Sequence, residues 1–229
     1  LGDALVGTAD EARAAAAYWA GRGFTSFKLY DAIGAPAAKA IIDEAHARGL
    51  TVTGHLGALG CAEAAGLGID FIEHAFASCA KDLATTPDGR GFTADPGNPA
   101  IQKLIDTLVK ARVVMVTTPS AVNRRISDEE LAIPHPHERA RSLVLMAGPP
   151  PWLPDANGLR ELRKLDRTFA AAGGRIGVGA GPMDFGLIAG YANHRALALL
   201  VEDGWTPLEV IRLATSNGAS LLGIGDETG

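Results

Sequence analysis

The chain has 229 residues, of which 47% are hydrophobic, and its formal net charge is −5 at pH 7. That size and composition allow a sizeable buried core, in one large α/β domain or two small ones. No basic segment is interleaved with aromatic residues, which argues against nucleic acid as a partner, and no apolar run reaches the roughly 18 residues of a membrane span. No signal-peptide pattern follows Leu1, so the compartment stays open between cytoplasmic and secreted or periplasmic.

Helix and strand signals alternate along the chain. In chain order they predict a helix at 8–21, a strand at 26–30, a helix at 36–49, a strand at 51–55, a helix at 58–65, a strand at 69–74, a helix at 98–112, a strand at 113–117, a helix at 155–172, a strand at 175–180 and a helix at 206–216. Capping boxes support the helices that begin near Thr8 and Thr206, because each threonine is followed three residues later by a glutamate.

Strands that alternate with helices indicate βαβ units and a parallel sheet. A closed (β/α)8 barrel, or TIM barrel, has eight strands, whereas this sequence predicts five. We therefore expect residues 1–229 to form a single incomplete barrel portion. Residues 118–154 are rich in proline and charge and interrupt the alternation, which predicts a long active-site excursion.

Three predicted strands end on residues that could hold a metal. Lys28 and Tyr30 share one face of the first strand, and His55 and His74 end the next two. Ligands of parallel sheets bind at the carboxyl ends of the strands. Neutral imidazole suits zinc and similar divalent ions. Each histidine alone could be a hydrogen-bonded core residue, but their equivalent positions in adjacent units favour metal ligands.

Lys28 is the sharper signal. Phe27 and Leu29 are expected to face the helices, which would direct Lys28 into the sheet interior. A buried ammonium is costly without a partner. A salt bridge would relieve this cost, and so would carboxylation to a carbamate that bridges two metal ions. The alternative is a lysine that extends to the rim.

The segments that carry these residues resemble the amidohydrolase superfamily, in particular its imidazolonepropionase-like and prolidase-like metal-dependent hydrolases. The resemblance rests on FKLY at 27–30, AHARGLTVTGHL at 45–56 and GIDFIEH at 68–74, and near the end of the chain on LLVEDGWTPLE at 199–209 and ATSNGASLLG at 214–223. The ordered set covers nearly the whole chain and is weakest between residues 81 and 154.

This resemblance implies a (β/α)8 barrel in which Lys28 is a carboxylated lysine after strand four, and His55 and His74 are metal ligands after strands five and six. It also implies one or two divalent ions, zinc above all. The metal would activate a water that attacks an amide, peptide or lactam carbonyl. The expected partner is a small-molecule or short-peptide substrate, which Tyr30 could contact, and a homo-oligomer stays open.

The sequence departs from the family pattern in its histidines. The family's first strand carries a His-x-His pair, and no histidine precedes Lys28. The only such pair is His135 and His137 around a proline. We interpret it as a surface or lid feature, because proline breaks strand geometry.

A second departure concerns the last strand. Gly181 stands where the family places an aspartate that binds metal and carries a proton. Asp184 is a candidate catalytic carboxylate if its loop folds back, although an ordinary loop aspartate is the simpler interpretation.

The other polar candidates have simpler interpretations. We expect His46 to pack on its helix, Cys61 to be buried and inert without a disulfide framework, and Arg124 and Arg125 to be solvated unless they bind a substrate carboxylate. A metal-dependent hydrolase is thus weighed against a catalytically silent homologue that binds a ligand or serves in an assembly, and against a fragment of an active enzyme.

Overall fold

A computed structural model describes residues 5–86, 91–119, 128–132, 136–137, 139–140, 143, 156–181 and 190–228. Five strands, β1–β5, alternate with helices and form one sheet in the order β1-β2-β3-β4-β5. The chain divides into two compact units, Leu1–Met115 with Thr168–Arg175, and Val116–Arg167 with Ile176–Gly229. In the described part of the chain, no helix is long and apolar enough to cross a membrane.

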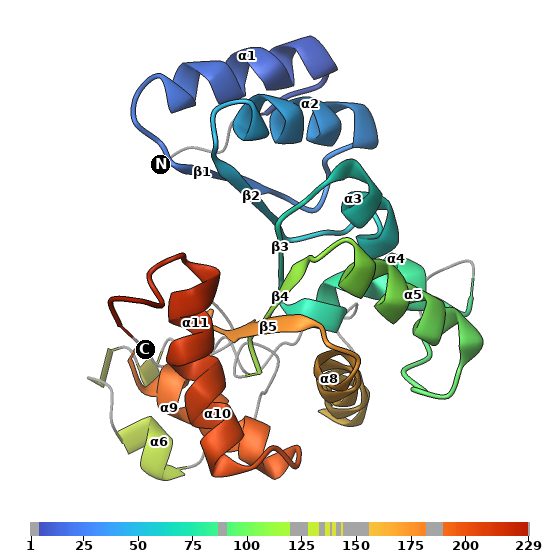
Figure 1. The fold of residues 1–229 in the computed structure, drawn as a ribbon. Helices are drawn as coiled ribbons and strands as arrows, with labels where there is room; N and C mark the ends of the chain where they lie inside the picture. The colour runs from blue at the N-terminus through green and yellow to red at the C-terminus, as the bar shows by residue number, and fades with distance from the viewer. Residues whose placement is uncertain are drawn as a thin grey trace. The chain divides into compact units, whose positions relative to one another are not determined.

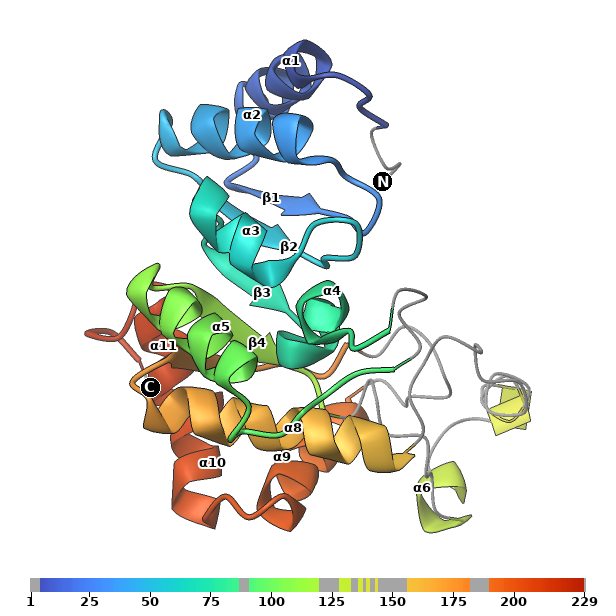
Figure 2. The same ribbon diagram turned by 90° about the vertical axis from the view of Figure 1, so that its right-hand side faces the viewer.

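The first unit is built from short strands joined by helices (Figures 1 and 2). Its elements are α1 (Ala9–Ala20), β1 (Ser26–Leu29), α2 (Ala35–His46), β2 (Thr51–Gly54), α3 (Cys61–Leu67), β3 (Phe71–Glu73), the 3-10 helix η1 (Ala75–Cys79), α4 (Ala80–Leu83) and α5 (Pro99–Lys110). Helices α1 and α2 lie side by side in both views. Fully buried alanines such as Ala12 and Ala38 allow this close packing, because a methyl group needs little space.

Strands β1, β2 and β3 are parallel, and their register aligns the ends that carry the candidate residues. Lys28 pairs with Thr53, and Leu29 pairs with Gly54. The backbone amide of His55 donates to the carbonyl of Leu29 at 3.1 Å, which extends the pairing by one residue beyond β2. Because these parallel strands are aligned in register, the residues that follow their carboxyl ends lie at the same edge of the sheet.

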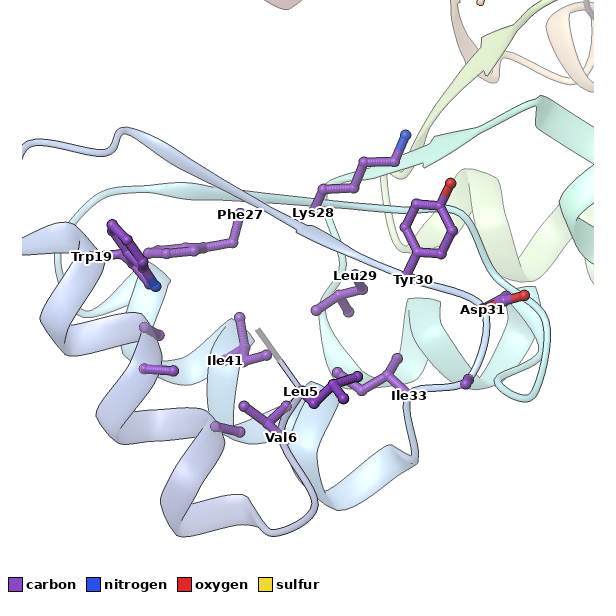
Figure 3. Close-up of a pocket in the computed structure, with 14 residues that line it drawn as sticks. Leu5, Val6, Trp19, Phe27, Lys28, Leu29, Tyr30, Asp31, Ile33 and Ile41 are labelled. Carbon is purple, nitrogen blue, oxygen red and sulfur yellow. The ribbon is translucent and has the colours of Figure 1, made fainter. Parts of the chain in front are cut away.

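The predicted faces of β1 are confirmed. Figure 3 shows Phe27 and Leu29 directed toward α1 and α2, while Lys28 and Tyr30 point the opposite way. The helix side encloses an apolar cavity of about 430 Å³ that includes Trp19 in its lining. Lys28, Tyr30 and Asp31 also belong to the lining of this cavity.

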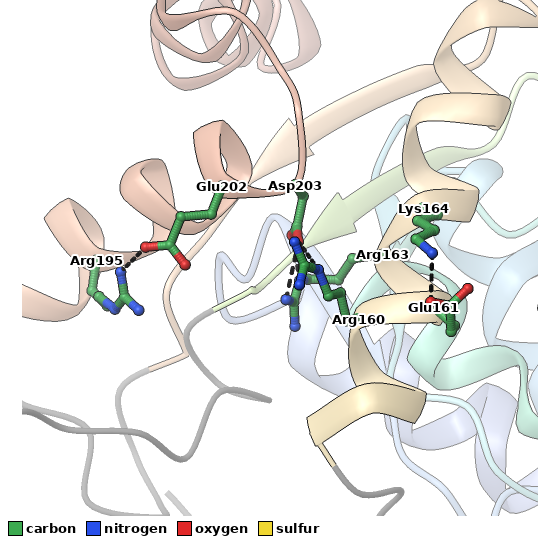
Figure 4. A network of polar contacts seen from close by, with 7 residues as sticks. All are labelled: Arg160, Glu161, Arg163, Lys164, Arg195, Glu202 and Asp203. Atoms are coloured by element: carbon green, nitrogen blue, oxygen red, sulfur yellow. Dashed lines mark hydrogen bonds and ion pairs between the residues drawn. The ribbon is translucent and has the colours of Figure 1, made fainter.

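The second unit contains most of the C-terminal helices. They are α6 (Asp128–Ala132), most of α8 (Ala156–Ala171), α9 (Tyr191–Glu202), α10 (Pro207–Ala214) and α11 (Ser216–Leu221), while β4 (Val114–Thr117) and β5 (Arg175–Val178) lie across the boundary. Asp203, the residue directly after α9, has an almost fully buried carboxylate that accepts hydrogen bonds from Arg163 at 2.5 and 3.2 Å (Figure 4). Arg160 lies 3.9 Å from the same carboxylate. A paired charge of this kind ties α8 to the end of α9.

The predicted helices and strands agree with the observed ones to within a few residues, and both capping boxes are present. The helix and strand signals did not predict η1, α4, α6, α9 or α11 as separate elements. Most of the predicted excursion at 118–154 lies outside the described residues.

The expectation that the cysteines are unlinked is wrong. Cys61 is buried as predicted, but it forms a disulfide with Cys79, 18 residues further along the chain. The physical reason is the fold of the intervening segment: α3 leads into β3, and η1 then turns back so that its last residue meets the first residue of α3. Sequence spacing alone does not show this return.

Candidate metal centre

The two histidines at the strand ends lie against each other. The ring centroids of His55 and His74 are 4.7 Å apart in an edge-to-face arrangement. The ring of Tyr30 lies 5.3 Å from that of His55, and the Lys28 ammonium lies 5.8 Å from the Tyr30 ring centroid. The structure therefore brings together the three predicted ligands and the predicted substrate-contacting tyrosine.

The environment keeps both imidazoles neutral near pH 7. Burial, the neighbouring His55 and the positive charge of Lys28, in this order of importance, together lower the pKa of His74 to about 4. Burial also lowers the pKa of His55, again with a contribution from Lys28, while Asp31 and Glu73 act in the opposite direction. The neutral imidazole is the form that binds a metal ion, because one of its ring nitrogens carries a lone pair instead of a proton.

The expectation that Lys28 is buried in the sheet interior is wrong for the described structure. Lys28 is exposed there, so the cost of burying an ammonium does not apply to it. Figure 3 shows its chain extending away from the helices with the nitrogen at the outer end. Its distance from the Tyr30 ring is within the range of a cation–π contact. The alternation of β1 predicted the face correctly, but it could not predict whether that face is covered.

The structure adds two residues that the sequence did not single out. Thr53, the register partner of Lys28, donates its hydroxyl to a carboxylate oxygen of Glu73 at 2.7 Å. Both side chains are partly buried. The signal was present in the sequence, because Thr53 shares a strand face with His55. The bond fixes a negative charge near His55, and that charge raises the pKa of His55 against the effect of burial.

We expect Thr53→Val to lower the free energy of unfolding by about 1–3 kcal/mol, because a hydrogen bond to a charged group is lost. Urea unfolding measures the effect. Thr51→Val is the matched control, since it makes the same chemical change on the same face of β2 at an exposed position. Equal losses in the two variants would contradict a specific contribution from the bond to Glu73.

His46 does not have the packing role expected of it. It ends α2 with an exposed side chain, and its Nε2 lies 2.9 Å from the carboxylate of Asp70. The same carboxylate oxygen accepts from the backbone amide of Val52 at 2.8 Å. Because Asp70 precedes β3 and Val52 lies near the start of β2, this contact is at the opposite end of the strands from the candidate metal centre.

Several predicted residues are not tested. Asp184, His135, Arg124 and Arg125 lie outside the described residues, and His137 is exposed. Gly181 has a backbone φ of 58°, in the left-handed region that glycine adopts without strain. Its hydrogen side chain supplies no carboxylate.

The donor set suits a divalent metal only in part. Two neutral imidazoles match a borderline-soft ion such as zinc. Among the described residues, no group of three or more His, Cys, Asp or Glu side chains could hold a metal ion. A third donor from this unit would have to be Lys28 as a carbamate, and the remaining positions would be taken by water or by groups outside the described residues.

No protein-family profile and no curated protein sequence matches the chain. Solved structures do match it. A candidate prolidase from Bifidobacterium longum aligns with 23% identity and a TM-score of 0.62, over 100% of this chain and 52% of that one. A Xaa-Pro dipeptidase with bound methionine in its active site aligns with 19% identity and a TM-score of 0.61, over 98% and 50%. Bottromycin amidohydrolase aligns with 20% identity and a TM-score of 0.66, over 96% and 51%.

These matches establish the fold. The chain shares the (β/α) fold of these structures, and it spans about half the length of the proteins it matches. The predicted fold class, a barrel portion with five strand–helix units, is confirmed. In such a barrel the carboxyl ends of the strands carry the active site. His55 and His74 follow directly from the carboxyl ends of β2 and β3.

Proposed function

We propose that this chain forms part of a metal-dependent hydrolase of C–N bonds in peptides or related small amides. The observation that carries the proposal is the meeting of His55 and His74 with Lys28 nearby, at the carboxyl ends of parallel strands. The hydrolases and peptidases among the matched structures support the same class of reaction. Their identity to this chain is low, so the local chemistry is the stronger argument.

The residues of this chain have distinct parts in the proposal. His55 and His74 would bind the metal through neutral ring nitrogens, and Lys28 would bind it through the oxygens of a carbamate. When bound, zinc would polarise a carbonyl and lower the pKa of a water. Tyr30 is exposed beside His55, where its hydroxyl could orient a substrate.

A second candidate, a silent homologue that binds a ligand without turnover, is favoured by Gly181. This residue gives the last strand no carboxylate to carry a proton, and general acid–base catalysis contributes about 10²- to 10⁴-fold in rate. The two candidates differ in turnover and agree in ligand binding.

Metal analysis combined with an assay distinguishes them. We expect the purified chain to bind one or two zinc ions and to release amine from a set of dipeptides and lactams, with activity lost to a chelator and restored by zinc. Metal binding without any turnover would support the silent homologue. Absence of metal binding would contradict the metal-dependent hydrolase and would support a silent homologue or an incomplete site.

A further inference from the structure

The disulfide joins the two segments that leave the histidine-bearing strands. Cys61 is the first residue of α3, the helix that follows His55, and Cys79 is the last residue of η1, which begins directly after His74. Both cysteines are fully buried. A covalent connection therefore runs from the segment after one candidate ligand to the segment after the other.

His74 has a backbone conformation that its neighbours must hold. Its φ is 61°, and Ala75 follows with a φ of 45°, so two successive non-glycine residues lie in the left-handed region. Such residues are strained and persist only where the surrounding structure fixes them. Two local hydrogen bonds span this turn. The Ser78 hydroxyl donates to the Glu73 carbonyl at 2.6 Å, and the Ala77 amide donates to the His74 carbonyl at 3.0 Å.

The far side of η1 is fixed against α3. Besides the disulfide, the carboxylate of Asp82 in α4 accepts from the backbone amides of Cys61 at 2.6 Å and Ala62 at 3.3 Å. Both ties attach to the first turn of α3. Of these two connections to α3, the disulfide is covalent and lies within η1, whereas Asp82 lies in α4. The disulfide therefore acts more directly than Asp82 on the strained turn at His74.

We propose that the Cys61–Cys79 disulfide positions His74 beside His55, and that reducing it weakens metal binding at this centre. The inference rests on the proposed function, because it takes both histidines as ligands. A dithiol would break the S–S bond by supplying two electrons and two protons, which leaves two thiols on the protein and converts the dithiol to its own disulfide. Without the bond, η1 loses its covalent tie to α3, and His74 can relax out of the left-handed region.

Zinc titration of the oxidised chain and of the Cys61→Ala/Cys79→Ala double variant tests the proposal without free thiols that could themselves bind zinc. We expect the double variant to bind zinc about 10- to 100-fold more weakly, the loss typical of removing groups that orient a ligand. Leu213→Ala is the control, because it removes a buried side chain of α10 in the other unit and lowers stability without touching the bridge.

A second measurement uses the unmodified chain. Reduction with a phosphine should weaken zinc binding and speed hydrogen exchange at the Ala77 amide, and reoxidation should reverse both changes. If the double variant does not fold, the exchange rate of the Ala77 amide, measured without zinc, decides the matter, because thiols that bind zinc do not affect it. A chain that binds zinc equally well in both redox states, with unchanged exchange at Ala77, overturns the inference alone. A chain that binds no zinc in either state overturns the proposed function as well.

Discussion

Lys28→Ala should lose zinc. If the carbamate of Lys28 is a metal ligand, its removal takes away roughly a quarter of a four-ligand site, and we expect zinc affinity to fall by about 10²- to 10³-fold. Isothermal titration and metal analysis of the dialysed protein measure the loss. Lys39→Ala is the matched control, since it removes an exposed lysine of α2 whose side chain pairs with Asp43.

Two further observations separate a carbamate from a simple charge. Lys28→Arg keeps the positive charge but cannot be carboxylated in the same way, so it should lose zinc as fully as the alanine variant. Short carboxylates such as acetate should partly restore metal to Lys28→Ala, because they supply the missing oxygen donor. Full zinc content in Lys28→Ala would show that Lys28 is a rim residue that only adjusts the charge near His55.

Local periodicity was enough to predict much of the fold. The alternation of Phe27, Lys28 and Leu29 assigned the two faces of β1, and the positions of His55 and His74 at the ends of successive strands placed them at one edge. These features depend on neighbours within one strand or one strand–helix unit. The sequence carries such information directly, because side chains alternate and parallel strands align their ends.

The features that the sequence did not predict depend on how distant segments return to each other. The disulfide between Cys61 and Cys79 requires the turn at His74. The sequence has no glycine at that position to indicate a left-handed backbone. The contact between His46 and Asp70 requires the end of α2 to lie beside the start of β3. The exposure of Lys28 depends on whether other chain covers its face, which periodicity does not contain.

The metal-free chain should lose stability as the pH falls from about 6.5 to about 4. His74 has a pKa of about 4 in the folded chain, whereas an unfolded histidine titrates near 6.5. Between these pH values the unfolded chain binds a proton at His74 that the folded chain does not bind. The contribution of His74 to the free energy of unfolding is therefore complete above about pH 6.5 and is lost as the pH falls toward about 4. The difference between the two pKa values limits this loss of stability to about 3 kcal/mol, and access of water to the site makes the loss smaller. His55, whose pKa is also lowered by burial, adds to the effect in the same direction.

Carboxylates titrate in the lower part of the same range, so the informative quantity is the difference between parent and His74→Gln. Urea unfolding from pH 4 to pH 7.5 should show a smaller loss of stability in His74→Gln, because glutamine takes up no proton in either state. His194→Gln makes the same chemical change at an exposed position of α9 and controls for the substitution itself. Saturating zinc should steepen the fall of stability with acid in the parent, since protons and the metal compete for the same ring nitrogens. Parallel pH profiles for the parent and His74→Gln would contradict a neutral, partly buried imidazole at this position, and with it the electrostatic basis for metal binding there.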